Sequence, residues 1–516
     1  MVVESAAPDP GEQLAAAIAA GDAERIVEIL MGNVWYFFTH DYRALQQAAA
    51  TLSDEMLERH PVLRLAHPLG GVLARTGRPI DPSEFDELLA SDDPTTVGLF
   101  LMIQGLASRA NGDTAAAVRS ARRLEDWIRQ TEFAASAQHD GPLWLFHHQI
   151  GSTYLVAGDT LNALRQLGVS RQIGVASGSV DAQRGAAGRI AIAHAVRGSL
   201  AVAEKSLAEA LALPGSAAAY ASAAYGTERA AAALISVERL APDADDRIAE
   251  LDAIDNFEII WPFELLAKAR LALGRQQPSE ALELATISAA THRVQAGSFA
   301  ADVLDSLTIE ALLALGDLSG ADRVAASSSA RGPLTRIAAV QASIHRGELT
   351  QAQEDLRYLG TRPTLSPLQR AQLAVFTVRL DALRGGQVSS HLAEEFAAAV
   401  TRQGYRRLAT TMPATVVPLI RSRLSPATET AFDAATADLA FADSAGSITR
   451  ALTESERRVL DALVLHETVA DIAAALHVSP NTVKTQLRSL YRKIGATTRA
   501  DAVAVGSRML SSQHGG

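Results

Sequence analysis

Apolar residues recur at helical spacing along almost the whole chain, from about Leu14 to residue 440. They fall three and four positions apart with polar residues between them, which is the pattern of amphipathic helices. No series of segments has the pattern expected of strands. We therefore predict an all-α body over residues 13–440, preceded by a disordered tail over residues 1–12, where prolines stand beside acidic and small residues.

Glycines divide the helical pattern at recurring places. Each time, a helix ends at a glycine, a short polar turn follows, and an alanine-rich helix begins. The turn glycines are Gly21, Gly112, Gly158, Gly198, Gly274, Gly316, Gly347 and Gly385. We expect each to follow a helix in the left-handed conformation that favours glycine. A period of roughly 40 residues with two helices in each unit predicts an α-solenoid of helical hairpins.

The pattern changes near the C-terminus, where three short amphipathic helices follow one another between Leu452 and Ile494. Each is preceded by a hydroxyl residue that can cap its first turn. Glu456 and Asp471 stand three residues after two of these, as the acidic residue of a capping box does. The three caps are Thr453, Thr468 and Ser479. Their apolar stripes are complete within the segment, which predicts a separate small domain over residues 451–512.

The third of these helices separates apolar from polar side chains. One face carries Val483, Leu487, Leu490 and Ile494, and the opposite face carries Asn481, Lys484, Thr485, Arg488 and Arg492. Guanidinium, ammonium, hydroxyl and amide groups are those that reach phosphates and base edges in a major groove. A basic helix face is usually only solvated, but three caps in register with a tight turn favour a helix-turn-helix reader of double-stranded DNA.

This stretch resembles the LuxR-type helix-turn-helix domain. The resemblance rests on LTxxExxVL, D-I-A, S-x-x-T-V-K, L-x-x-x-Y-x-K-I-G and T-R-A-D-A-V. The sequence departs from the family at His466 and Ala470, where glycine and lysine are usual, and at Gln486, where histidine is usual. The resemblance implies a fourth helix capped by Thr498 and a homodimer on DNA.

Two sets of site residues follow from the resemblance and the helix faces. We expect DNA contacts from Thr468, Ser479, Asn481, Thr482, Lys484, Thr485, Gln486, Arg488, Arg492 and Lys493. We expect dimer contacts from Ala500, Val503 and Ala504.

Composition narrows the class of protein. Of the 516 residues none is cysteine, which excludes disulfides and thiolate metal sites. The net charge is −11, but residues 451–516 carry eight Arg and Lys against six acids, which makes this segment +2 and the remainder −13. An acidic body is repelled by phosphates, so DNA contact is expected from the C-terminal segment alone. The N-terminus lacks the basic start of a signal peptide and no apolar run reaches membrane-spanning length, so we expect a cytoplasmic protein.

The body resembles the tetratricopeptide-like sensor domains of the maltose-regulator-like branch of LuxR-type regulators. Members of that branch usually carry an ATP-binding module, but this sequence has no G-x-x-x-x-G-K-[ST] motif. A receiver domain is not expected either, because its alternating strands are missing from the pattern. The resemblance implies a bacterial regulator whose body responds to a small molecule or a protein.

Aromatic and histidine side chains are the only candidates for chemistry in the body. They form three clusters: Trp35, Tyr36, Phe37, Phe38, His40 and Tyr42; His139, Trp144, Phe146, His147 and His148; and Phe257, Trp261 and Phe263. Packing between helices is the favoured interpretation, with a ligand pocket as the alternative. Neither metal-ligand spacing nor a catalytic motif is present, so we expect no metal, no cofactor and no enzymatic activity.

Small residues between Ala440 and Arg450 predict a linker over residues 441–450, after a helix from about Glu429 to Ala440. Two functions remain open for the whole chain. The first is a transcription regulator whose body controls a LuxR-type reader. The second is a scaffold of helical repeats whose helix-turn-helix serves as a weak tether or a protein-binding module.

Overall fold

The structure, a computed structural model, describes residues 9–33, 36–37, 41–60, 63, 94–131, 143–215, 218–252, 260–327, 332–385, 388–442, 454–466, 468–494, 499 and 502–503. These residues form 26 helices, and their strand pairing is limited to one isolated bridge between Pro413 and Ala442. The predicted all-α class is confirmed.

The chain divides into two compact units. Unit 1 consists of Met1–Val237, Ala241–Lys268 and Thr286–Ala301. Unit 2 consists of Glu238–Leu240, Ala269–Ala285 and Asp302–Gly516.

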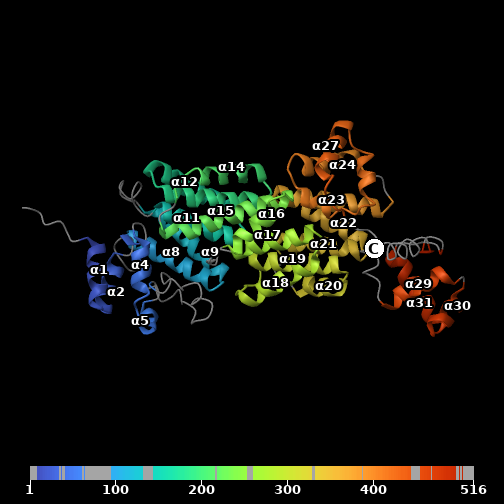
Figure 1. Cartoon of the computed structure of the whole chain (residues 1–516), viewed down its shortest axis with the longest axis horizontal. Coiled ribbons are helices and arrows are strands. Elements are labelled where there is room, and N and C mark those ends of the chain that lie inside the picture. The colour runs from blue at the N-terminus through green and yellow to red at the C-terminus, as the bar shows by residue number, and fades with distance from the viewer. Residues whose placement is uncertain are drawn as a thin grey trace, which may run out of the picture. The chain divides into compact units, whose positions relative to one another are not determined.

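The helices before residue 253 pack mainly on their neighbours in sequence. They are α1 (Pro10–Ala20), α2 (Ala23–Gly32), α4 (Tyr42–Ala49), α5 (Asp54–Arg59), α8 (Pro94–Ala110), α9 (Thr114–Gln130), α11 (Leu143–Val156), α12 (Thr160–Ser177), α13 (Val180–Arg197), α14 (Leu200–Leu211), α15 (Ala218–Arg239) and α16 (Ala244–Asp252) (Figure 1). Each helix from α11 to α13 packs on the next one, and α11 also packs against α8 and α13. Packing on the next helix and the next but one is the arrangement of an α-solenoid.

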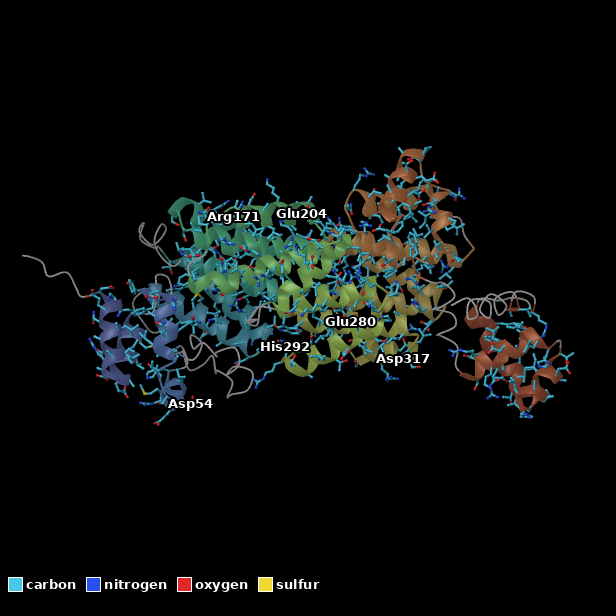
Figure 2. All side chains as sticks on the ribbon, viewed as in Figure 1. Asp54, Arg171, Glu204, Glu280, His292 and Asp317 are labelled. Carbon is cyan, nitrogen blue, oxygen red and sulfur yellow. The ribbon has the colours of Figure 1, made fainter. Side chains whose placement is uncertain are left out.

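The helices from residue 260 to the end of the body repeat this arrangement. They are α17 (Trp261–Gly274), α18 (Pro278–Thr291), α19 (Phe299–Leu315), α20 (Leu318–Ser327), α21 (Pro333–His345), α22 (Leu349–Gly360), α23 (Pro367–Leu383), α24 (Ser390–Thr401), α25 (Arg406–Thr410), α26 (Val417–Arg421) and α27 (Pro426–Thr436). Each helix from α20 to α24 packs on the next, and α21 also packs on α23. Side chains fill the spaces between the ribbons (Figure 2).

A glycine followed by a capping residue builds the recurring turn. Gly158 has φ 77° and its N–H donates to the carbonyl of Leu155 over 3.0 Å, which ends α11. The next residue, Asp159, donates its N–H to Tyr154, and its carboxylate accepts from the N–H of Asn162 over 3.2 Å. One dipeptide therefore ends one helix and caps the next.

Gly274 does not have the role that we predicted for it. Seven of the eight predicted turn glycines have positive φ, but Gly274 is the last residue of α17, and Gln276 takes the left-handed conformation with φ 60°. Close packing explains the glycine, because a Cβ there would lie 3.2 Å from Leu240 Cδ2 and 3.3 Å from Arg407 Cγ.

Several aromatic rings of the three predicted clusters are buried or stacked on a ring of another helix or turn. Phe37, Phe146 and Phe263 are at most 1% exposed, and the ring of Trp261 stacks on His292 with centroids 4.2 Å apart. Trp35, Phe38, His40, His139 and Phe257 lie outside the described residues. Within the described ranges, no group of three potential metal ligands comes together, and no helix is long and apolar enough to cross a membrane.

The last helix of the body begins and ends earlier than predicted. α27 starts at Pro426, because proline fits the first helical position, and it ends at Thr436 instead of Ala440. Arg406 explains the end: its Nε donates to the carbonyl of Ala435 over 2.8 Å, and that carbonyl would otherwise accept a hydrogen bond from the next turn of the helix. Ala442 then donates to the carbonyl of Met412 over 3.0 Å, and residues 443–450 of the predicted linker lie outside the described residues.

Candidate nucleic-acid interface

Three helices near the C-terminus enclose a small core of their own. They are α29 (Glu454–Leu465), α30 (Val469–Leu476) and α31 (Pro480–Ile494), and each packs against the other two (Figure 1). The buried core residues are Val459, Leu460, Ala462, Leu463, Ile472, Ala473, Val483, Leu487, Leu490 and Ala502. The apolar stripes read from the sequence therefore meet as predicted.

Side-chain caps set the start of the second and third helices. The hydroxyl of Thr468 accepts from the N–H of Asp471 over 3.2 Å and donates to its carboxylate over 2.6 Å. The hydroxyl of Ser479 accepts from the N–H of Thr482 over 3.1 Å, and the two hydroxyls are 2.8 Å apart. Both predicted caps are confirmed, whereas Thr453 lies outside the described residues.

The turn between α30 and α31 depends on His477. Its φ of 56° and ψ of 42° are left-handed, and its N–H donates to the carbonyl of Ala474 over 3.3 Å. The N–H of Val478 donates to Ala473 over 3.0 Å, so both bonds close the end of α30. Residues other than glycine are uncommon in this conformation, and the sequence gives no glycine or asparagine that would have signalled it.

Residues after α31 extend this core. Ala502 is fully buried, and Val503 is half-buried against the same core. Arg499 donates to the carbonyl of Leu463 over 3.1 Å and to that of His466, which closes the end of α29. Sequence reasoning missed this role, because Arg499 follows α31 and is 36 and 33 residues along the chain from the two carbonyls that it reaches. Ala500, Ala504 and Thr498 lie outside the described residues, and the dimer contacts stay a prediction.

The face of α31 opposite the core is polar and exposed. Lys484, Thr485 and Arg488 are exposed, as are Ser479 and Thr482 at the helix start and Thr468 at the start of α30. Gln486 is half-buried. No ion pair joins Lys484 or Arg488 to any other residue that the structure describes, so both cations are available to an anionic partner. Asn481, Arg492 and Lys493 belong to α31, but their side chains lie outside the described residues.

A short helix, a left-handed turn and a longer helix with an exposed basic face form a helix-turn-helix unit. Residues 450–505 match the family model described as bacterial regulatory proteins, luxR family. This segment is a LuxR-family helix-turn-helix domain. α31 is the second helix of its helix-turn-helix, the one that enters the major groove in such units.

The LuxR-family domain also has similar segments in curated proteins. The chain is 41% identical over 64 residues to the "Probable transcriptional regulatory protein NarL" from each of two strains of Mycobacterium tuberculosis. The alignment covers 12% of this chain and 30% of each relative. The chain thus spans about 30% of the length of the curated relatives it matches, and the likeness concerns this domain rather than the body.

Proposed function

We propose that this chain is a cytoplasmic DNA-binding transcription regulator. The LuxR-family domain reads double-stranded DNA, and the tetratricopeptide-like body controls that reading in response to a small molecule or a protein, without a catalytic step. The main support is the face of α31, where Lys484 and Arg488 are exposed while Val483 and Leu487 are buried. A surface of this kind supplies the contacts that position a helix in the major groove and read bases there.

The alternative is a scaffold in which the helix-turn-helix is a weak tether. A domain released from DNA binding has no need to keep cations on this face, and Lys484 and Arg488 are both present and exposed. The two functions differ in a mobility-shift assay with genomic fragments. A regulator gives a shift that competitor DNA of random sequence does not abolish, whereas a tether gives none.

The variants Lys484→Ala and Arg488→Ala test the assignment of α31. Each is expected to weaken specific binding by about 1–3 kcal/mol, because one bidentate base contact contributes that much discrimination. The measurement is fluorescence anisotropy on specific and random duplexes, with circular dichroism to confirm folding. Arg458→Ala is the matched control, because it removes an exposed cation from α29 instead.

Equal losses on specific and random DNA for Lys484→Ala and Arg488→Ala would contradict base reading. Arg492 and Lys493, later on α31, are expected to bind phosphates. Their alanine variants should weaken binding to every sequence alike and lower the salt dependence by roughly one unit for each phosphate that is no longer neutralised.

Dimeric binding is part of the proposal, because one small domain buries too little DNA surface to select a site in a genome. Footprinting should then show two half-sites roughly 10 base pairs apart from centre to centre. Val503 is half-buried against the core of its own domain, so Val503→Asp must be checked for folding before a loss of dimer is interpreted. A single protected half-site would exclude the dimer.

A further inference from the structure

Helix α13 carries two buried arginines whose surroundings differ. Arg184 is 6% exposed, and its Nε and Nη2 donate to the two carboxylate oxygens of Glu228 over 2.7 and 2.9 Å. Arg189 is 5% exposed, and its Nη1 donates to the carbonyl of Gly185 over 3.2 Å. Its Nε has no hydrogen-bond partner, and no carboxylate among the described residues pairs with it.

Two further basic side chains belong to the same part of unit 1, and with Arg189 we name them the Arg189 cluster. His148, on α11, is 6% exposed, and a Cβ at Gly185 would lie 3.1 Å from its Cε1. Its Nδ1 also lacks a partner in the described structure. Arg109, on α8, donates to the hydroxyl of Thr153 over 3.1 Å and to the side chain of Gln149 over 2.8 Å.

The electrostatics of the cluster leave positive charge in the interior. Burial and the charge of Arg109 lower the pKa of Arg189 to about 9, so Arg189 is still a cation at neutral pH. Burial, Arg189 and Arg109 hold the pKa of His148 well below its ordinary value, so its ring is neutral. A buried guanidinium without a counter-ion costs several kcal/mol, and an anion bound beside it would remove much of that cost.

The packing around Arg109 is incomplete. A cavity of about 10 Å³ lies between α8, α9 and α11, lined by Arg109, Gln149 and Thr153 together with apolar side chains. That is room for about one water molecule, and Arg189 and His148 do not line this cavity, so a carboxylate or phosphate group reaches Arg189 only when side chains around the cluster move.

We propose that the Arg189 cluster binds the carboxylate or phosphate group of a small anionic molecule, with Arg189 as the ion-pair partner and His148 and Arg109 beside it. Guanidinium suits this role because its donors match the spacing of carboxylate and phosphate oxygens. DNA is excluded as the anion because the cluster is buried. That such a molecule is the effector of the regulator rests on the proposed function, whereas its binding does not.

Tryptophan fluorescence of the full chain tests the site. All four tryptophans belong to unit 1, and the Trp144 ring lies 6.2 Å from the His148 ring, so part of the emission arises beside the cluster. Inorganic phosphate and sodium acetate are titrated separately against chloride at constant ionic strength. We expect a saturable change and a higher unfolding midpoint with one of them, and the responsive anion identifies the group that the site prefers.

Arg189→Met keeps most of the side-chain volume and removes the charge, and it should weaken anion binding by about tenfold or more. Arg119→Met is the matched control, because it removes an exposed cation from the neighbouring α9 and should leave binding unchanged. The proposal is overturned if chloride produces the same response, or if Arg189→Met responds like the unmodified chain. A failure to bind DNA would appear only in the mobility-shift assay and would leave the titration result intact.

Discussion

Two groups of buried charges, one in each unit, differ in whether their charges are paired. In unit 2, Glu238 is 1% exposed, and its Oε1 accepts from Arg270 Nη1 over 2.7 Å and from Arg407 Nε over 3.1 Å. Glu310 lies near this Glu238 network, where burial raises the pKa of its carboxyl group although Arg407 and Arg270 act against the rise. The Arg189 cluster of unit 1 has basic groups and no carboxylate partner for Arg189 within the described residues.

The pKa values follow this difference. Burial raises the pKa of Glu238, but Arg407 and Arg270 outweigh burial and leave the pKa below its ordinary value. Nothing in the Arg189 cluster offsets burial in this way, and the pKa of Arg189 falls to about 9. The Glu238 network therefore neutralises its charges within the chain and has a structural role, even though Glu238 Oε2 has no hydrogen-bond partner, whereas Arg189 has no counter-ion among the described residues.

Breaking the Glu238 network should have the largest effect on stability. Glu238→Gln leaves Arg270 and Arg407 buried with a weaker partner, and removing one member of a buried ion pair costs about 3–5 kcal/mol. Urea denaturation followed by circular dichroism should show the loss in the transition of unit 2. Glu348→Gln is the control, because its pair with Arg346 is exposed and contributes about 0–1 kcal/mol. Similar losses in both variants would contradict the structural role.

Acid should weaken the Arg189 cluster at a higher pH than the Glu238 network. The folded pKa of His148 lies well below its value of about 6.5 in the unfolded chain, so the unfolded state binds more protons below that pH. The stability contribution is present above about pH 6.5 and is lost as the pH falls, by up to about 1.4 kcal/mol for each pH unit. Because the pKa of Glu238 is lowered, the Glu238 network loses stability only at the lower pH where carboxylates titrate.

The unfolding midpoint of unit 1, followed by tryptophan fluorescence at pH 7 and pH 5, measures this acid sensitivity, to which His147 and His194 also contribute because burial lowers their pKa values. His148→Gln should flatten this dependence, because glutamine does not titrate. His60→Gln replaces a half-buried histidine of the same unit outside the cluster and should retain the dependence. An unchanged slope in His148→Gln would show that other groups carry the acid sensitivity.

Removing the uncompensated charge of Arg189 should have the smallest effect on stability, and that effect should have the opposite sign to the losses above. In a buffer without phosphate or carboxylate, Arg189→Met is expected to leave unit 1 as stable or to stabilise it by about 1 kcal/mol, because an unpaired buried charge is removed. Arg184→Met, on the same helix, breaks the pair with Glu228 and should destabilise unit 1. Equal destabilisation by both variants would mean that Arg189 has a partner of its own.

The LuxR-family domain was largely predictable because its signals are local. The caps Thr468 and Ser479, and the division of α31 into a buried face and an exposed face, depend on residues a few positions apart. Gly274 and the end of α27 were predicted wrongly, because Arg407 and Arg406 reach these places from other parts of the chain. The DNA contacts themselves depend on a partner and stay predictions.

The sequence by itself determined the helices, the glycine turns and the polar face of α31, since each depends on spacing along a few turns of chain. It could not show which of the 47 Arg and Lys residues are buried, or which of those are paired. Arg184 and Arg189 are five positions apart on one helix, yet Arg184 pairs with Glu228, 44 residues away, and Arg189 with no carboxylate that the structure describes. Pairing at such separation exists only after the helices have packed, because packing alone brings the two charges together and removes the water that would otherwise separate them.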